Sequence, residues 1–164
     1  MTPVLKIYLG TIGYGGLAHA DFMTALLAFR LACKARGVRL MLDMVGGEAL
    51  ICRGHAVMLA KFLISDASHL LLLEADRAFE GEAIFRLLDA GEDLATGDHG
   101  MLLISRRAAE RLDAAYPELV AHIEAGANAG VAQATMVFDP FIEDRTGRYL
   151  YDHDALQRRW RELG

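Results

Sequence analysis

One short stretch constrains the fold of this chain more than any other: Ser68–Phe79, which reads SHLLLLEADRAF. Four leucines, Leu70 to Leu73, lead directly into Glu74 and Asp76. A short apolar run of this kind is typical of a strand buried on both faces of a parallel sheet. The carboxylates would then follow the C-terminal end of the strand, where open α/β sheets bind ligands. There they suit a hard divalent cation; the alternative is that they simply begin a solvated turn.

Length and composition favour a single domain over residues 1–164. No apolar run approaches the roughly 20 residues that cross a bilayer, so we expect no membrane span, and the N-terminus reads as a first strand rather than a signal peptide. The net charge of −5 gives no electrostatic basis for binding nucleic acid. Cys33 and Cys52 lie in apolar helical patterns, which favours reduced core residues and a cytoplasmic location.

The first half of the chain alternates between strand and helix patterns. Phe22, Leu26, Phe29 and Cys33 recur at helical spacing and predict one buried stripe, with Gly37 ending that helix. The expected strands are 4–9, 38–45 and the leucine run, and the expected helices are 18–36, 48–64 and 81–88. The order β-α-β-α-β-α predicts right-handed crossovers and a parallel sheet.

The second half contains shorter elements. We expect extended segments at 93–97, 101–104 and 133–138, a tight turn at 98–100, helices at 106–115 and 117–125, a hairpin turn at 144–148 and a last helix at 152–163. Ser105 is placed to cap the helix that follows it. The fold class is therefore α/β, with a mostly parallel central sheet flanked by helices.

The loop after the first strand is rich in glycine and reads GTIGYGGLAHADF from Gly10 to Phe22. Its spacing matches neither GxGxxG nor the P-loop, so it is a weak phosphate motif but a convincing strand-to-helix loop. Thr11 and Tyr14 offer a hydroxyl and a stacking face to a nucleotide, and Gly15 allows close approach of the backbone. The alternative is that they are ordinary loop residues.

Two side chains of the second helix are also candidates. Arg53 follows a glycine pair and is placed to bind a phosphate bidentately, although a solvated helical arginine is the commoner case. His55 shares the expected inner stripe with Ile51, Met58 and Phe62. We interpret His55 as a hydrogen-bonded residue at the edge of the core rather than a ligand.

Taken in order, four segments resemble nucleotide-sugar glycosyltransferases of the GT-A type, in the broad family-2-like group. The segments are LKIYLGTIGYGGLAHADF, GGEALICRGHAVMLAKFLISDASHLLLLEAD, GMLLISRRAAERL and TGRYLYDHDALQRRWRELG. Together they span nearly the whole chain. In this chain Glu74 stands where the Asp-x-Asp motif of the family begins, and the chain is shorter than its pattern between Gly97 and Met101.

The resemblance implies a nucleotide-diphosphate sugar bound over the C-terminal edge of the sheet. A divalent cation, manganese or magnesium, would bridge Glu74 and Asp76 to the diphosphate and stabilise the leaving group as a Lewis acid. The substrate-binding residues that it implies are Thr11, Tyr14, Gly15, Glu48 and Arg53.

The resemblance also implies an acidic catalytic base near the last helix. The Glu-Asp pair of the family aligns with Asp152 and His153, so the base is expected among Asp152, His153 and Asp154. The alternative is a helix cap without a catalytic role.

Two functional readings follow from these residues. The first is a metal-dependent transferase of a sugar to an acceptor hydroxyl. The second is a non-catalytic relative that binds a nucleotide or nucleotide sugar and acts with a partner. A doubly wound signalling or flavin-type domain is disfavoured because its phosphate and acidic-pocket patterns are missing. The apolar surplus would also allow a homodimer.

Overall fold

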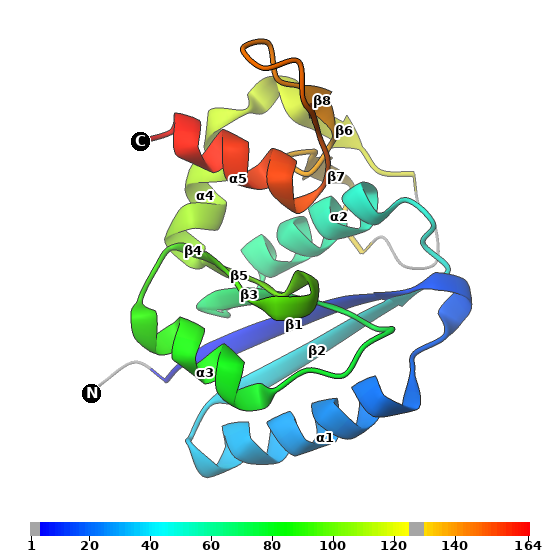
Figure 1. Ribbon diagram of the computed structural model, residues 1–164, viewed down its shortest axis with the longest axis vertical. Coiled ribbons are helices and arrows are strands. Elements are labelled where there is room, and N and C mark those ends of the chain that lie inside the picture. The colour runs from blue at the N-terminus through cyan, green and yellow to red at the C-terminus, as the bar shows by residue number, and fades with distance from the viewer. Residues whose placement is uncertain (1–3, 125–129) are drawn as a thin grey trace.

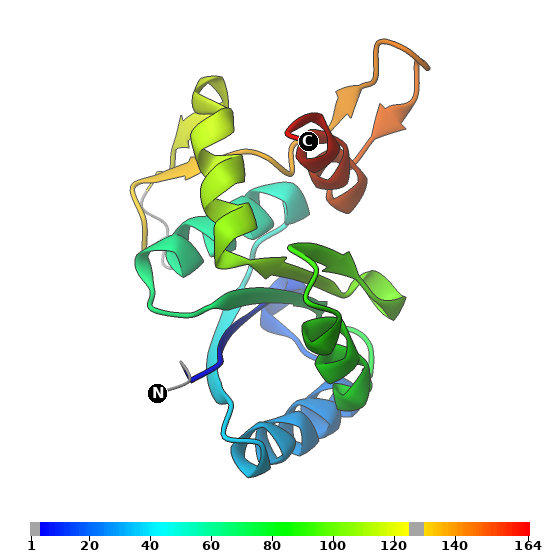
Figure 2. The same ribbon diagram turned by 90° about the vertical axis from the view of Figure 1, so that its left-hand side faces the viewer.

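A five-stranded sheet separates two layers of helices in the computed structural model, which describes residues 4–124 and 130–164 (Figures 1 and 2). In spatial order the strands are β2 (Arg39–Gly46), β1 (Lys6–Gly13), β3 (His69–Glu74), β5 (Leu102–Ser105) and β4 (Leu94–Thr96). One face carries α1 (Ala20–Ala35) and α3 (Gly81–Ala90). The other carries α2 (Ile51–Ile64), α4 (Arg106–Ala115) and α5 (His153–Glu162).

The smaller elements are three short 3-10 helices and two hairpins. They are η1 (Tyr14–Gly16), η2 (Asp98–Gly100), η3 (Pro117–Leu119), β6 (Val120–His122) with β7 (Gln133–Thr135), and β8 (Phe141–Ile142) with β9 (Tyr149–Leu150). No described helix has the length and apolar character needed to cross a membrane.

Strand β3 is buried on both faces, as the leucine run predicts. Leu70 and Leu72 pack in the cluster beneath α2, whereas Leu71 and Leu73 pack against α1 and α3. All four side chains are at most 4% exposed. The two apolar clusters therefore meet at this strand, which fixes the position of Glu74 at its end.

The sheet is mixed rather than purely parallel. Strands β1, β2 and β3 pair in parallel, but β5 is antiparallel to both β3 and β4. The reason lies in the connection from β4 to β5, where only η2 joins the strands and the Gly97 amide donates to the Met101 carbonyl at 2.9 Å. A parallel pair needs a crossover of about a dozen residues or more, so this short turn requires reversal.

Three local predictions for the second half have mixed outcomes. Ser105 caps α4 as expected, since its hydroxyl accepts from the Ala108 amide at 3.1 Å. The helix expected at 117–125 is wrong, because η3 leads into β6, which pairs with β7 instead; residue 125 lies outside the described residues. The strand expected at 133–138 ends at Thr135, where the backbone turns.

Helix α5 is fastened to the preceding loop by a buried arginine. Nη1 of Arg159 donates to the carbonyls of Val137 and Asp139, each at 2.8 Å, and the residue is 8% exposed. Ala155 and Leu156 on the same helix are fully buried. These contacts hold α5 against the preceding loop, and a hydrogen bond between His55 and Asp152 joins its start to α2, which lies below it in Figure 1.

Candidate functional site

At the carboxyl edge of β1 and β3, strands that follow β1 in the sequence lie on both of its sides. From β1 the chain goes first to β2 on one side and later to β3 on the other, giving the order β2-β1-β3. Open α/β sheets bind ligands in the crevice at such a switch point. Ile12 of β1 is the register partner of Glu74 of β3, so Glu74 lies at this position.

Glu74 and Asp76 both interact with one arginine. Nε of Arg77 lies 3.0 Å from Oε2 of Glu74 and 3.5 Å from Oδ1 of Asp76. Both carboxylates are well exposed, at 45% and 62% of their side-chain surface. The two predicted metal ligands are thus close to a common cation, and a bound metal would compete with the Arg77 guanidinium for them.

The loop expected from Gly10 begins only after Gly13, because β1 runs from Lys6 to Gly13 and includes Thr11. Thr11 is fully buried and donates to the Leu73 carbonyl at 2.7 Å, so it braces β1 against β3 and does not line a solvent-facing site. Tyr14 is 79% exposed. Gly15 follows it with φ +63°, a backbone conformation that favours glycine.

Glu48 and Arg53 bind each other at the start of α2. The Arg53 guanidinium donates to both carboxylate oxygens of Glu48, at 2.9 and 3.0 Å, and the Leu50 amide also donates to Glu48 at 2.8 Å. Burial acts to raise the pKa of Glu48, but these hydrogen bonds outweigh it and leave the pKa below its ordinary value. Half of the Arg53 side chain remains exposed, which keeps it accessible to an anion.

The side chain of His55 on α2 is hydrogen-bonded to Asp152, the residue before α5. Its Nδ1 lies 2.8 Å from Oδ1 of Asp152, and because a carboxylate only accepts, Nδ1 is the donor. The side chains are 8% and 13% exposed. His55 is therefore hydrogen-bonded as expected, whereas Ile51, expected on the same inner stripe, is 43% exposed.

His153 completes this group. Its ring stacks on that of His55 with centroids 5.3 Å apart and an interplanar angle of 29°. Its Nε2 lies 3.5 Å from Oδ2 of Asp152 without a hydrogen bond between them, and this buried nitrogen has no hydrogen-bond partner among the described residues. Burial lowers the pKa of His153, with the Asp152 charge acting in the opposite direction.

Asp152 adopts an unusual backbone conformation, with φ +49° and ψ −112°. A residue with a side chain rarely has positive φ, and such strain costs on the order of 1–3 kcal/mol where surrounding structure enforces it. Asp152 precedes α5 but its side chain caps no amide of that helix. The simple helix-cap alternative therefore does not describe Asp152, and Asp154, also expected as a candidate base, is exposed.

The cluster of His55, Asp152 and His153 lies near the carboxyl edge of the sheet. A Cβ placed on Gly54 would come within 2.4 Å of the Ile12 side chain, so α2 touches the end of β1 one residue before His55. Among the described residues this is the group of three His, Cys, Asp or Glu side chains whose ligand atoms lie within 4.8 Å of one another. Glu74 and Asp76 belong to no such group within the described part of the chain.

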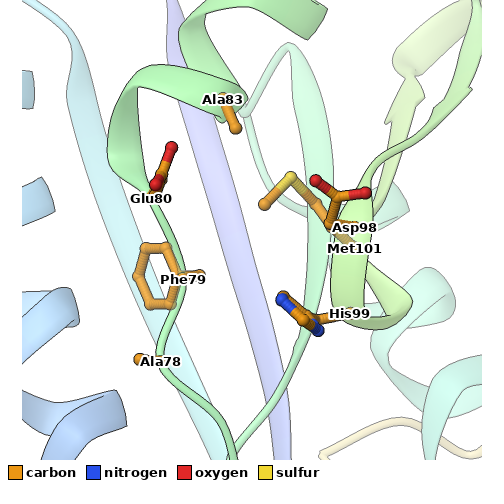
Figure 3. Close-up of a pocket in the computed structure, with 7 residues that line it drawn as sticks. All are labelled: Ala78, Phe79, Glu80, Ala83, Asp98, His99 and Met101. Carbon is orange, nitrogen blue, oxygen red and sulfur yellow. The ribbon is translucent and has the colours of Figure 1, made fainter.

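A cavity of about 330 Å³ opens beside the segment that follows Asp76 (Figure 3). Residues between β3 and α3, together with Ala83 of α3, line one side of it, and residues of η2 and Met101 line the other. Its lining is Ala78, Phe79, Glu80, Ala83, Asp98, His99 and Met101. The sequence singled out none of these as a binding residue, although it predicts the turn in which His99 has φ +57°.

Sequence reasoning also missed the partnership of His55 with Asp152. The available signal was a histidine on an otherwise apolar helical stripe, because such a side chain needs a polar partner when buried. Nothing in the local sequence says that the partner comes from residue 152. Comparisons with protein-family models, curated proteins and solved structures gave no significant match.

Proposed function

We propose that this chain binds a nucleotide-diphosphate sugar at the carboxyl edge of β1, β2 and β3 and transfers the sugar to an acceptor hydroxyl. The observation that carries the proposal is the position of Glu74 at the switch point opposite Ile12, with Asp76 exposed just beyond it. Ligands of α/β sheets gather at this edge, and paired carboxylates there suit a manganese or magnesium ion.

The proposed donor site draws on three segments that follow parallel strands. Tyr14 after β1 would stack on the base, and the half-exposed Arg53 beyond β2 would contact the diphosphate. A divalent cation held by Glu74 and Asp76 would stabilise the charge on the leaving diphosphate. Thr11 has no direct contact in this proposal, because its hydroxyl is buried and bonded to Leu73.

Asp152 is the preferred base of the proposed transfer. Its Oδ1 accepts from His55, and this contact orients the largely buried carboxylate near the sheet edge. A base must lie within hydrogen-bond reach of the hydroxyl that it deprotonates, so the acceptor would approach from the side of α5.

A second function, binding without transfer, is supported by Arg77. This guanidinium contacts both Glu74 and Asp76. It supplies the positive charge that a bound metal ion would supply in a transferase. Such a protein would hold the diphosphate through Arg53 and Arg77 and would need no metal.

The test is a thermal-unfolding panel of nucleoside diphosphates and nucleotide sugars, with and without Mn²⁺. A ligand at about 100 times its Kd stabilises a fold by about 2.7 kcal/mol. We expect Mn²⁺-dependent stabilisation that Asp76→Ala abolishes and that Asp89→Ala, which removes an exposed carboxylate on α3, retains. A panel with no stabilising nucleotide would refute both functions. An Asp76→Ala protein that keeps the full Mn²⁺-dependent stabilisation would refute the metal site of the transferase.

Release of nucleoside diphosphate from a nucleotide sugar then separates the two functions. Metal-dependent release in the presence of an acceptor supports the transferase. Tight binding that is independent of metal, persists in Asp76→Ala and gives no release supports the binding protein instead.

A further inference from the structure

We propose that His55, Asp152 and His153 form a binding site for a divalent first-row transition metal of the Zn²⁺ class. This site is separate from the Glu74–Asp76 pair, and its existence does not depend on the proposed donor site. Two imidazoles and one carboxylate are a common protein ligand set for such metals, whereas Mg²⁺ and Ca²⁺ prefer oxygen ligands alone.

The spacing of the ligand atoms fits a small metal ion. Ligand atoms about 2.1 Å from a tetrahedral Zn²⁺ lie about 3.4 Å apart. Oδ2 of Asp152 and Nε2 of His153 are 3.5 Å apart, which already matches this spacing. One ligand atom from each of the three residues lies within 4.8 Å of the others, so side-chain shifts of about 1 Å would complete the set. A metal bound at Nδ1 of His55 would displace the proton that this atom donates to Asp152.

The buried nitrogen of His153 is the second line of support. Buried polar atoms are nearly always hydrogen-bonded, and an exception calls for a physical explanation such as an ion. Nε2 of His153 lacks a hydrogen-bond partner among the described residues and faces the Asp152 carboxylate. A metal bound at Nε2 would satisfy this atom.

The cluster offers three ligands beside an apolar wall, and three protein ligands are typical of a catalytic rather than a structural zinc site. Phe138, fully buried, lies beside both imidazoles, with ring centroids 5.3 Å from His55 and 6.5 Å from His153. Such an apolar wall limits the access of water and strengthens the interaction of the ligands with a cation. Three protein ligands leave a fourth position for a water or a hydroxyl group.

A metal in this position would change the role of Asp152. The carboxylate would act as a ligand instead of the base, and the metal would lower the pKa of the acceptor hydroxyl so that its proton passes to solvent water; this role, unlike the binding itself, rests on the proposed function. The strained backbone of Asp152 then has a purpose, because it turns the carboxylate back toward His55 and His153.

The test uses the full chain, freed of metal by a chelator and without nucleotide. We expect calorimetry to show one equivalent of Zn²⁺ bound per chain. Co²⁺ should give the strong visible absorption of a tetrahedral complex. This measurement uses the wild-type protein and needs no variant. His153→Gln and Asp152→Asn, which keep polar side chains of similar size, should each weaken Zn²⁺ binding at least tenfold.

Two control variants separate this site from other histidines and from the donor site. His19→Gln alters an exposed histidine at the start of α1 and should bind Zn²⁺ as the wild type does. Asp76→Ala should also keep Zn²⁺ binding, even where it loses nucleotide binding. A wild-type protein that binds neither Zn²⁺ nor Co²⁺, or His153→Gln and Asp152→Asn proteins that bind with unchanged affinity, would overturn the proposal.

Discussion

Nδ1 of His55 donates a hydrogen bond of 2.8 Å to Oδ1 of Asp152, across 97 positions of the chain. This contact joins the second turn of α2 to the residue that precedes α5. It places two side chains that are far apart in the sequence in one largely buried group with His153. The predictions below test how that group, the carboxylates after β3 and the sheet around them behave.

The backbone strain at Asp152 predicts an inverted order of stability for two variants. Glycine adopts φ +49° without steric cost, whereas alanine keeps the strain and loses the carboxylate. We therefore expect Asp152→Gly to be more stable than Asp152→Ala by about 1–2 kcal/mol in denaturant unfolding. At Asp154, inside α5, the order should be the opposite, because glycine disfavours helix by up to about 1 kcal/mol. The same order at both positions would contradict the strain.

Arg77 is expected to hold back cation binding at Glu74 and Asp76. Removing its charge in Arg77→Ala leaves the two carboxylates uncompensated, so Mn²⁺ alone should bind severalfold more tightly at low ionic strength. Arg86→Ala, which removes an exposed arginine of α3, is the matched control. Titration of Mn²⁺ by calorimetry measures the difference, and equal affinities in the two variants would show that Arg77 does not compete.

Thr11 is expected to act in stability and not in binding. Thr11→Val removes the buried hydrogen bond to the Leu73 carbonyl and should lower the free energy of unfolding by about 1–2 kcal/mol. Thr24→Val removes an exposed hydroxyl-to-carbonyl bond of 3.0 Å and should cost less. Chemical denaturation measures both values. A loss of nucleotide affinity in a stably folded Thr11→Val protein would restore Thr11 as a substrate-binding residue.

The ionisation of Asp93 makes the stability of the fold depend on pH in the acid range. Hydrogen bonds from Arg107 and then from Ser105 hold the pKa of Asp93 below its ordinary value. The contribution of ionised Asp93 to the free energy of unfolding is thus fully present above the unfolded-state pKa of about 3.9. It is lost as pH falls through the lower folded-state pKa.

Asp93→Asn should therefore be less stable than the wild type at about pH 7, by about 1 kcal/mol or less, since the Arg107 partner is exposed. The difference should shrink below about pH 4. Asp89→Asn reports the general effect of removing one surface charge. Unfolding curves over this pH range decide the matter, and a difference that stays constant with pH would be the contrary result.

The first half of the fold could be predicted because its signals are local. The stripe of Phe22, Leu26, Phe29 and Cys33 is buried as its spacing indicates, and the leucine run forms the doubly buried β3. Cys33 and Cys52 are free and buried, as their apolar surroundings indicate. In each case the pattern lies within a single segment, so the burial of its side chains can be predicted without knowing which other segments it packs against.

The second half was less predictable because tertiary pairing decides it. Residues 120–122 follow a proline and look helical, yet they pair with β7. The reversal of β5 depends on the length of one connection, and the apolar run of that strand is equally compatible with either direction. At the candidate site, Asp152 and His153 were selected through a likeness to a family motif, but their contact with His55 is a long-range event that no local pattern encodes.

The anchoring of α5 also bears on the order in which the protein folds. Each βα unit of the sheet forms from neighbouring segments, whereas closing the 97-residue span between His55 and Asp152 carries the larger loop entropy. We expect the sheet to form first and the histidine cluster to assemble late, when Arg159 docks on the carbonyls of Val137 and Asp139. Chemistry at this cluster would then be available only to chains whose last helix is in place.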